Sequence, residues 1–278
     1  MRDHECLVLA RDYGCTISLC EYYDLPYVVY GGNENTSRSL ALSLPSQSTS
    51  IVRAARSFDP DVVFGRGAYA ALAGSVTDST LVLLMDSNPW QLGLVLPAKL
   101  ADYVLTTGAF KTDLGPHHYR FDGLTENAYL HPDVYDPDPS VRDELGVSTD
   151  ESYAIVRFNA FGAFHDIGEA GFSRTQGRQL VRQLAEHTTV FVSNEGDSVD
   201  VDALPTREYD LHPARIHDAL AEASLFVADT GTMVTEAALV GTPAVRASRR
   251  AGEDDLGEFE ELHERGLVRN VLPQAAIE

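Results

Sequence analysis

The stretch DTGTMVTEAALVGTPAVR, residues 229–246, combines groups whose types and spacing could bind an anion. It follows the apolar run SLFVA, which is typical of a buried strand, and Gly231 allows a tight turn before a helix that begins near Thr232. The first N–H groups of a helix have no partner within that helix and carry a partial positive charge. This turn can therefore hold a phosphate group without any lysine.

A carboxylate follows one turn into the same predicted helix. Glu236 lies four residues after Thr232 and therefore on the same helix face. A carboxylate accepts two hydrogen bonds at once, which matches the two neighbouring hydroxyls of a ribose. The stretch thus predicts a diphosphate at the N–H groups of Thr232, Met233 and Val234, and a ribose at Glu236.

The simpler interpretation is that Glu236 only complements the helix dipole and that the helix is an ordinary core-facing one. A capping box does not explain Glu236, because that motif places the acid three residues after the cap, where this sequence has Thr235. The spacing alone leaves both interpretations open.

Further candidates follow the ends of other predicted strands. Arg157 ends the run YAIVRF; because lysine is nearly absent from the chain, an arginine is the expected bidentate clamp for phosphate oxygens, with a surface ion pair as the alternative. Ser193 and Glu195 come just after the run TVFV. Gly65 and Gly67 follow the run DVVF and permit close approach of the backbone to a ligand.

His165 and Asp166 are adjacent, as in an oriented acid–base pair or half of a metal site. Two neighbouring residues are weak support for a metal, and His117 and His118 have no third ligand at recognisable spacing. We therefore expect His117 and His118 to be surface residues, and neither a metal nor a cofactor is predicted. The sequence has no GxSxG, HExxH or Walker motif.

Short apolar runs alternate with segments of helical periodicity along the whole chain. The predicted strands are 5–10, 26–31, 61–65, 80–85, 102–107, 153–158, 189–193, 224–228 and 242–246. Helical periodicity covers segments 50–58, 178–187, 214–223 and 233–240. This alternation indicates an α/β fold whose parallel strands are covered on both faces.

The length of 278 residues suits two domains. The stretch 131–151 holds three prolines and many acids, which is typical of a domain boundary. We therefore expect two Rossmann-like domains, 1–132 and 133–278, that face a cleft at the carboxyl ends of their strands.

The chain carries 42 acidic residues against 21 Lys and Arg, a net charge of −21. This charge disfavours nucleic acid and anionic membranes as partners. Acid excess with scarce lysine looks like adaptation to high salt, as in a halophile. The chain has no apolar run long enough to cross a bilayer and no signal peptide at its start, so the expected location is cytoplasmic.

Several stretches together resemble a mainly archaeal family of uncharacterised proteins with a GT-B-like fold. These stretches are DHECLVLARD (3–12), FDPDVVFGRG (58–67), FDGLTENAYLHP (121–132), VRFNAFGAFHDIGEAGFS (156–173) and GTMVTEAALVGTPAVR (231–246). That family looks like a distant relative of UDP-N-acetylglucosamine 2-epimerases and GT-B glycosyltransferases. Proteins of this type normally begin with one more βα unit, so the resemblance implies that the first βα unit is missing here, through a misassigned start or a shortened protein.

Carried over to this chain, the resemblance implies that Gly231, Thr232 and Met233 contact the phosphates and that Glu236 contacts the ribose. With Arg157 also placed at the phosphates, the expected function is that of a metal-independent glycosyltransferase. Its partners would be a nucleotide sugar, UDP-linked rather than GDP-linked, and a glycan or lipid-linked acceptor.

The reacting sugar is expected to face three groups that serve as base or orienting groups, namely His165, Asp166 and Glu126. A nucleotide-sugar 2-epimerase and a non-catalytic, shortened relative are the alternatives. The acid/base residues of the 2-epimerases have no clean match in this sequence. An HD-type phosphohydrolase is a weaker alternative, because it would require a bound metal.

Overall fold

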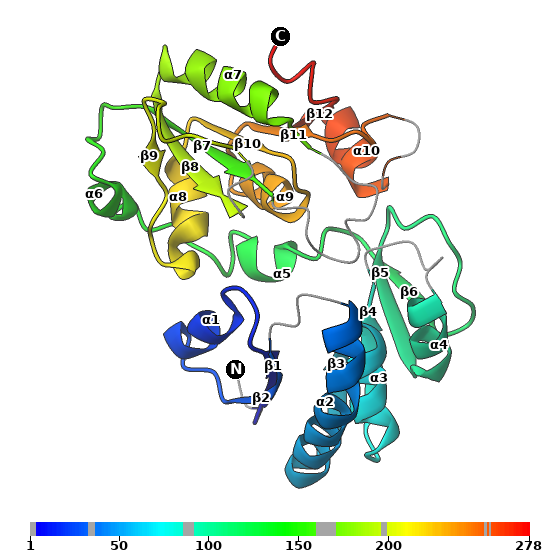
Figure 1. Cartoon of the computed structure of the whole chain (residues 1–278). Coiled ribbons are helices and arrows are strands. Elements are labelled where there is room, and N and C mark those ends of the chain that lie inside the picture. Colours follow the sequence, from blue (N-terminus) through cyan, green and yellow to red (C-terminus); the bar gives the residue numbers. More distant parts are fainter. Residues whose placement is uncertain are drawn as a thin grey trace. The chain divides into compact units, whose positions relative to one another are not determined.

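The computed structural model describes residues 4–32, 37–85, 92–159, 171–195, 199–252, 255 and 257–278 (Figure 1). The chain divides into two compact units, residues 1–123 and 124–278. Each unit is built from helices and parallel strands. The predicted α/β fold is therefore confirmed.

The second unit is organised around a six-stranded parallel sheet in the order β12-β11-β10-β7-β8-β9. Its strands are β7 (Tyr153–Phe158), β8 (Thr189–Asn194), β9 (Arg207–Glu208), β10 (Leu225–Ala228), β11 (Ala244–Ala247) and β12 (Val268–Val271). The chain runs outward from β7 to β8 and β9, and then returns to β10 on the other side of β7. The sheet is thus doubly wound, and its direction of winding reverses between β7 and β10.

Alternate residues of the central strands pack on opposite faces of this sheet, because successive side chains of a strand point to opposite sides. On β7, Tyr153 and Ile155 belong to one buried cluster, whereas Val156 and Phe158 belong to the other. Burial on both faces explains why these strands read as continuous apolar runs in the sequence.

Helices cover both faces of the sheet, as Figure 1 shows. One face is covered by α7 (Arg174–Ala185), which contributes Leu180 and Val181 to its cluster. The other face is covered by α6 (Val141–Leu145), α8 (Ile216–Glu222), α9 (Thr232–Leu239) and α10 (Gly257–Glu264). A short helix, α5 (Asn127–Leu130), packs against α9, and the 3₁₀ helix η3 (Pro213–Arg215) precedes α8.

The first unit holds two parallel sheets. One pairs β1 (Val8–Arg11) with β2 (Tyr27–Gly31), and the other has the order β3-β4-β5-β6. The strands of the larger sheet are β3 (Val62–Gly65), β4 (Thr80–Leu84), β5 (Tyr103–Thr107) and β6 (His118–Phe121). The helices of this unit are α1 (Thr16–Tyr22), α2 (Ser37–Phe58), α3 (Gly67–Ser75) and α4 (Leu92–Leu100).

Helix α2 connects the two sheets of the first unit. Its residues Ile51 and Ala55 are buried in a cluster that also contacts Leu9 of β1 and Val63 of β3. Residues of both sheets therefore pack against this one cluster.

All nine strands expected from the sequence are present, and each of the four predicted helical segments overlaps a helix. The strands that the sequence did not predict are β6, β9 and β12. The stretch 131–151, predicted to mark a domain boundary, lies within the second unit, where Val141 and Leu145 of α6 are buried in the core. The missing first βα unit stays a prediction.

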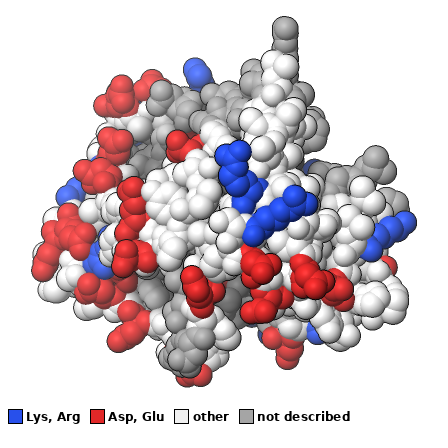
Figure 2. Space-filling view, turned by 90° about the horizontal axis from the view of Figure 1, so that it is seen from below, with Lys and Arg blue, Asp and Glu red and all other residues white. Residues whose placement is uncertain are grey.

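Red Asp and Glu groups gather on the left and lower parts of the face drawn in Figure 2, whereas blue Lys and Arg groups are scattered over it. In the part of the chain that the structure describes, no helix has the length and hydropathy that a bilayer crossing requires.

Candidate functional site

The reversal point of the second sheet brings several predicted residues to one edge. Arg157 of β7 lies in register with Ala228 of β10 on one side and with Ser193 of β8 on the other. Because the strands are parallel, their carboxyl ends share this edge, and three residues separate the end of β10 from the start of α9. Ligands of doubly wound sheets bind at such a point.

The start of α9 carries no side-chain cap. Gly231 is its N-cap residue, and a Cβ at Gly231 would lie 2.5 Å from the Phe259 ring, so the turn requires glycine. Within the described residues, the N–H groups of Thr232 and Met233 donate no hydrogen bond. The N–H of Val234, expected to face the ligand, instead donates to the Gly231 carbonyl at 2.9 Å. Two N–H groups, together with the exposed Thr232 side chain, are thus left for an anion.

Asp229 directly follows β10, at the start of this turn, and is buried. Its Oδ1 accepts a hydrogen bond from the N–H of Asn159 at 2.9 Å, and its Oδ2 accepts one from the N–H of Phe172 at 3.4 Å. Burial raises the pKa of Asp229 to about 6, although both N–H groups favour the charged form. Asp229 was not among the residues predicted from the sequence.

Arg157 is engaged by two of the other predicted residues. Its guanidinium donates to the Ser193 hydroxyl at 3.3 Å and forms an ion pair with the Glu195 carboxylate. Arg157 therefore fits both interpretations. It lies at the carboxyl edge beside the start of α9, where a phosphate clamp was expected, and it forms an ion pair. An anion that binds Arg157 must compete with Glu195.

Glu236 lies inside the protein, with 7% of its surface exposed. Its Oε1 accepts a hydrogen bond from the Tyr129 hydroxyl of α5 at 2.7 Å. His217 of α8 places Nε2 3.1 Å from the same oxygen, although the geometry there does not meet that of a hydrogen bond. Oε2 accepts no hydrogen bond from the residues that the structure describes, so it remains available as an acceptor.

The partners of Glu236 are held by a second polar cluster. Asp218 of α8 accepts hydrogen bonds from the Tyr135 hydroxyl at 2.6 Å and from the N–H of Asp138 at 3.0 Å, and it pairs with Arg215. These contacts attach the segment after α5, which includes Tyr135 and Asp138, to helix α8. No local sequence pattern signals either cluster, because 107 residues separate Tyr129 from Glu236 and 83 separate Tyr135 from Asp218.

Glu126, predicted to face the reacting sugar, is the N-cap residue of α5 and is buried. Its Oε2 accepts a hydrogen bond from the Thr125 hydroxyl at 2.9 Å. It therefore lies directly before the short helix that carries Tyr129. His165 and Asp166, the other two predicted groups, lie outside the described residues.

Gly65 is the last residue of β3 and Gly67 is the first residue of α3, both in the first unit. Gly67 has a φ of 66°, which favours glycine, and a Cβ at Gly65 would lie 2.9 Å from that of Ala70. The turn therefore requires glycines for its own geometry, independently of any ligand.

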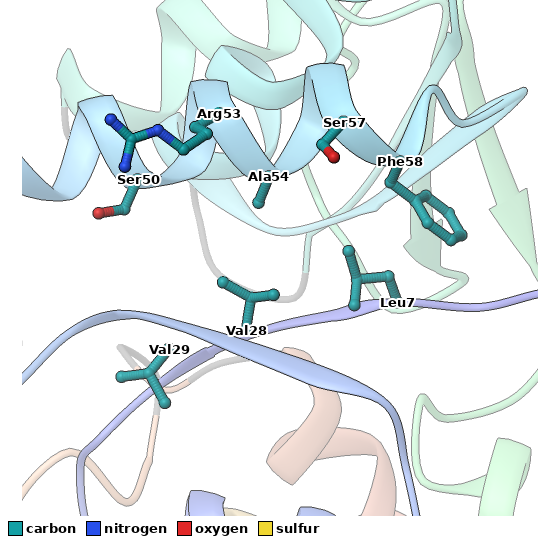
Figure 3. Close-up of a pocket in the computed structure, with 8 residues that line it drawn as sticks. All are labelled: Leu7, Val28, Val29, Ser50, Arg53, Ala54, Ser57 and Phe58. Carbon is teal, nitrogen blue, oxygen red and sulfur yellow. The ribbon is translucent and has the colours of Figure 1, made fainter.

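A pocket of ≈ 510 Å³ also lies in the first unit, between α2 and the β1–β2 sheet (Figure 3). Its lining is Leu7, Val28, Val29, Ser50, Arg53, Ala54, Ser57 and Phe58. In Figure 3, Leu7 and Val28 point toward α2. None of the predicted site residues lines this pocket.

The prediction of surface histidines was wrong for His118, whose side chain is fully buried. Its Nε2 lies 2.8 Å from the Thr106 hydroxyl, and Nδ1 accepts a hydrogen bond from the N–H of Leu114. Burial lowers the pKa of His118, so the neutral ring is a structural group of the first unit. Among the described residues, His, Cys, Asp and Glu side chains form no group of three or more that could hold a metal ion.

Comparison with known proteins defines the fold. The Staphylococcus aureus protein MnaA, solved with UDP, matches with a TM-score of 0.63 and 14% identity over 94% of this chain and 75% of that one. The UDP-GlcNAc 2-epimerase of Methanocaldococcus jannaschii matches with a TM-score of 0.60 and 13% identity over 94% and 79%. The spinosyn forosaminyltransferase SpnP matches with a TM-score of 0.63 and 12% identity over 96% and 78%.

No protein-family model and no curated protein matches the chain. At identities this low, the structural matches establish the fold alone, and they confirm the predicted GT-B-like class with two Rossmann-like units.

Proposed function

We propose that this protein binds a nucleotide sugar, with UDP as its nucleotide, and acts as a metal-independent glycosyltransferase on a glycan or lipid-linked acceptor. One observation carries the proposal: α9 begins, uncapped, at the point where the winding of the second sheet reverses, and it bears a buried carboxylate one turn further on. Two proteins of similar fold support UDP as the nucleotide, because one was solved with UDP and the other is named a UDP-GlcNAc 2-epimerase. A third is named a forosaminyltransferase, which supports a transfer reaction.

The proposed roles follow from the chemistry of each group. The N–H groups of Thr232 and Met233 bind the diphosphate, with Gly231 allowing its close approach, and Arg157 clamps its oxygens once Glu195 is displaced. Donors that are fixed before the reaction stabilise the negative charge that develops on the departing diphosphate. Glu236 binds the ribose.

The acceptor side of the proposed reaction needs a base. Glu126, His165 and Asp166 are the proposed base or orienting groups. Gly65 and Gly67 of the first unit, and Ser193 beside Arg157, are proposed to line the substrate.

The test is calorimetric titration of UDP, GDP and dTDP into the protein at high salt. UDP is expected to bind most tightly, and Glu236→Ala should cost on the order of 2 kcal/mol, as for the loss of hydrogen bonds to a charged group. A wild-type protein that binds none of the three nucleotides would contradict the proposal.

The second candidate is a 2-epimerase acting on a nucleotide sugar, because the structural match from Methanocaldococcus jannaschii is named a UDP-GlcNAc 2-epimerase. Product analysis after incubation with UDP-GlcNAc separates the two reactions. An epimerase converts the sugar without an acceptor and leaves it attached to UDP, whereas a transferase releases UDP as it modifies an acceptor. A protein that binds UDP and does neither would be a non-catalytic relative.

A further inference from the structure

The carboxylate of Glu236 is held from outside its own helix. The Tyr129 hydroxyl donates to Oε1 at 2.7 Å, and it comes from α5, a helix that packs against α9 but lies more than a hundred residues earlier in the chain. This hydrogen bond has a charged acceptor and lies at a site with little exposure, two conditions that make such a bond strong.

Because of this hydrogen bond, the two oxygens of the Glu236 carboxylate have different surroundings. Oε1 faces Tyr129 and His217, whereas Oε2 accepts no hydrogen bond within the described part of the chain. A free glutamate side chain samples several rotamers, and a ligand that needs one of them must bear the cost of fixing it. A carboxylate that is already fixed avoids this cost.

The tyrosine itself is supported by aromatic neighbours. Its ring centroid lies 5.5 Å from that of His217 at an angle of 41°, and the His217 ring packs edge-on against Tyr135 at 6.1 Å. Tyr135 in turn donates to Asp218 of α8. The position of the Tyr129 hydroxyl is therefore set by packing rather than by Glu236 alone.

We propose that Tyr129 is a positioning residue for the nucleotide: it fixes Glu236 Oε1 on the α5 side, so that Oε2 is held ready for the ribose hydroxyls. This inference rests on the proposed function. It assigns to Tyr129 no contact with the reacting atoms, because the residue acts through Glu236.

The test compares the affinities of UDP and of 2′,3′-dideoxy-UDP, which lacks both ribose hydroxyls. Tyr129→Phe is expected to weaken UDP binding about tenfold, as for a lost hydrogen bond to a charged group, and to leave binding of the dideoxy compound unchanged. The double variant Tyr129→Phe/Glu236→Ala should bind UDP as weakly as Glu236→Ala, because the two residues act as one unit. The ratio of the two affinities does not depend on the fraction of protein that is folded.

Tyr27→Phe is the matched control. It removes a hydroxyl that donates to the Glu21 carboxylate of the first unit at 3.3 Å, so it should leave the ratio of the two affinities as in the wild type. Equal losses for both ligands in Tyr129→Phe, no loss at all, or additive losses in the double variant would overturn the inference.

The result that would contradict the proposed function differs from the result that would contradict the inference on Tyr129. If the wild-type protein does not bind UDP, that function falls and the inference falls with it. If UDP binds and Glu236→Ala weakens it while Tyr129→Phe does not, only the inference is overturned.

Discussion

Asp229 Oδ1 accepts a hydrogen bond from the N–H of Asn159 at 2.9 Å, and this contact joins the carboxyl ends of β10 and β7. The two strands flank the reversal point of the sheet, so a single buried carboxyl links both sides of the proposed anion site. The close fit is visible at Gly171 as well, where a Cβ would lie 2.1 Å from Asp229 Oδ2. The protonation state of Asp229 therefore bears on the stability of this edge.

We expect Asp229 to make the protein less stable as the pH rises. Its pKa is raised to about 6 in the folded state, above the value of 3.8 expected for an unfolded chain. The stability that its protonated form provides is complete below pH 3.8 and is lost as the pH rises through about 6, for a total on the order of 3 kcal/mol. Chemical denaturation of the wild type and of Asp229→Asn, between about pH 4.5 and 7.5, measures this difference.

Asp229→Asn should weaken the fall in stability over this interval, because it removes the titrating group. Asp138→Asn is the control with the opposite sign. The N–H of Ser140 lowers the pKa of Asp138 from its ordinary value of 3.8, so that carboxyl stabilises the protein in its charged form. The whole interval lies above that value, so the loss of Asp138 should cost stability throughout it and leave the shape of the pH profile unchanged. Parallel pH profiles for the wild type and Asp229→Asn would contradict the assignment.

Substitutions of Arg157 and of Glu195, which form an ion pair, should change the affinity for UDP in opposite directions. Arg157→Gln should weaken UDP binding about tenfold, because it removes a charged donor to phosphate. Glu195→Gln should tighten UDP binding by roughly two- to fivefold, because it removes the competing carboxylate of a partly exposed ion pair. Titration calorimetry at moderate salt measures both effects.

Arg178 offers a matched control for that experiment. It is partly exposed and pairs with Asp200 at 2.9 Å, and it lies on α7. Arg178→Gln should leave UDP affinity unchanged. Weaker UDP binding by Glu195→Gln would mean that the acid helps to bind the ligand instead of competing for Arg157.

The sequence predicts the strands of this fold well for a physical reason. Strands such as β10, which reads LFVA, are buried on both faces, so each one appears as an unbroken apolar run. The strands that were missed have polar sequences: β6 reads HYRF, β9 reads RE and β12 reads VRNV. Such segments are defined by pairing with a neighbour, which periodicity does not reveal.

The same distinction between local and tertiary structure applies to the residues of the candidate site. Gly231, Thr232 and Glu236 follow from local spacing, because the start of a helix and the following turn are local structure. The partners of Glu236 do not, because Tyr129 and His217 come from separate helices that only the tertiary fold brings to α9. Similarly, the predicted availability of the Val234 N–H was wrong, since the carbonyl of Gly231 accepts its hydrogen bond.

The net charge of −21 leads to a prediction about salt. Like charges on the acidic surface repel one another, and dissolved ions screen this repulsion. The melting temperature should therefore rise by several degrees between about 0.1 and about 1 M KCl, over which the screening length shortens to about a third. Sucrose, which favours the compact state without screening charge, should raise it less at equal osmolality. A melting temperature that falls or stays level with added KCl would contradict the proposed adaptation to high salt.

Gly231→Ala should destabilise the second unit through one identifiable contact. The added Cβ would lie 2.5 Å from the Phe259 ring, which is buried and held by the Arg246 guanidinium 3.8 Å from the ring centroid. Because the ring has little room to move, the cost is expected to be about 1–3 kcal/mol, as for overpacking in a core. Phe259→Leu removes the obstructing atoms, so it should cost less in the Gly231→Ala background than in the wild type.

Gly241→Ala separates this steric cost from backbone strain. Gly241 has a φ of 90° and no atom within 4 Å of its missing Cβ, so its replacement is costly for conformational reasons alone. Phe259→Leu should therefore give no coupling with Gly241→Ala in a double-mutant cycle measured by denaturant unfolding. If the coupling is also absent between Gly231→Ala and Phe259→Leu, then the turn before α9 adjusts to a side chain, and its glycine is not required by packing. In that case Gly231→Ala would be expected to fold normally, and any loss of UDP affinity in that variant would come from the ligand's approach to the helix start.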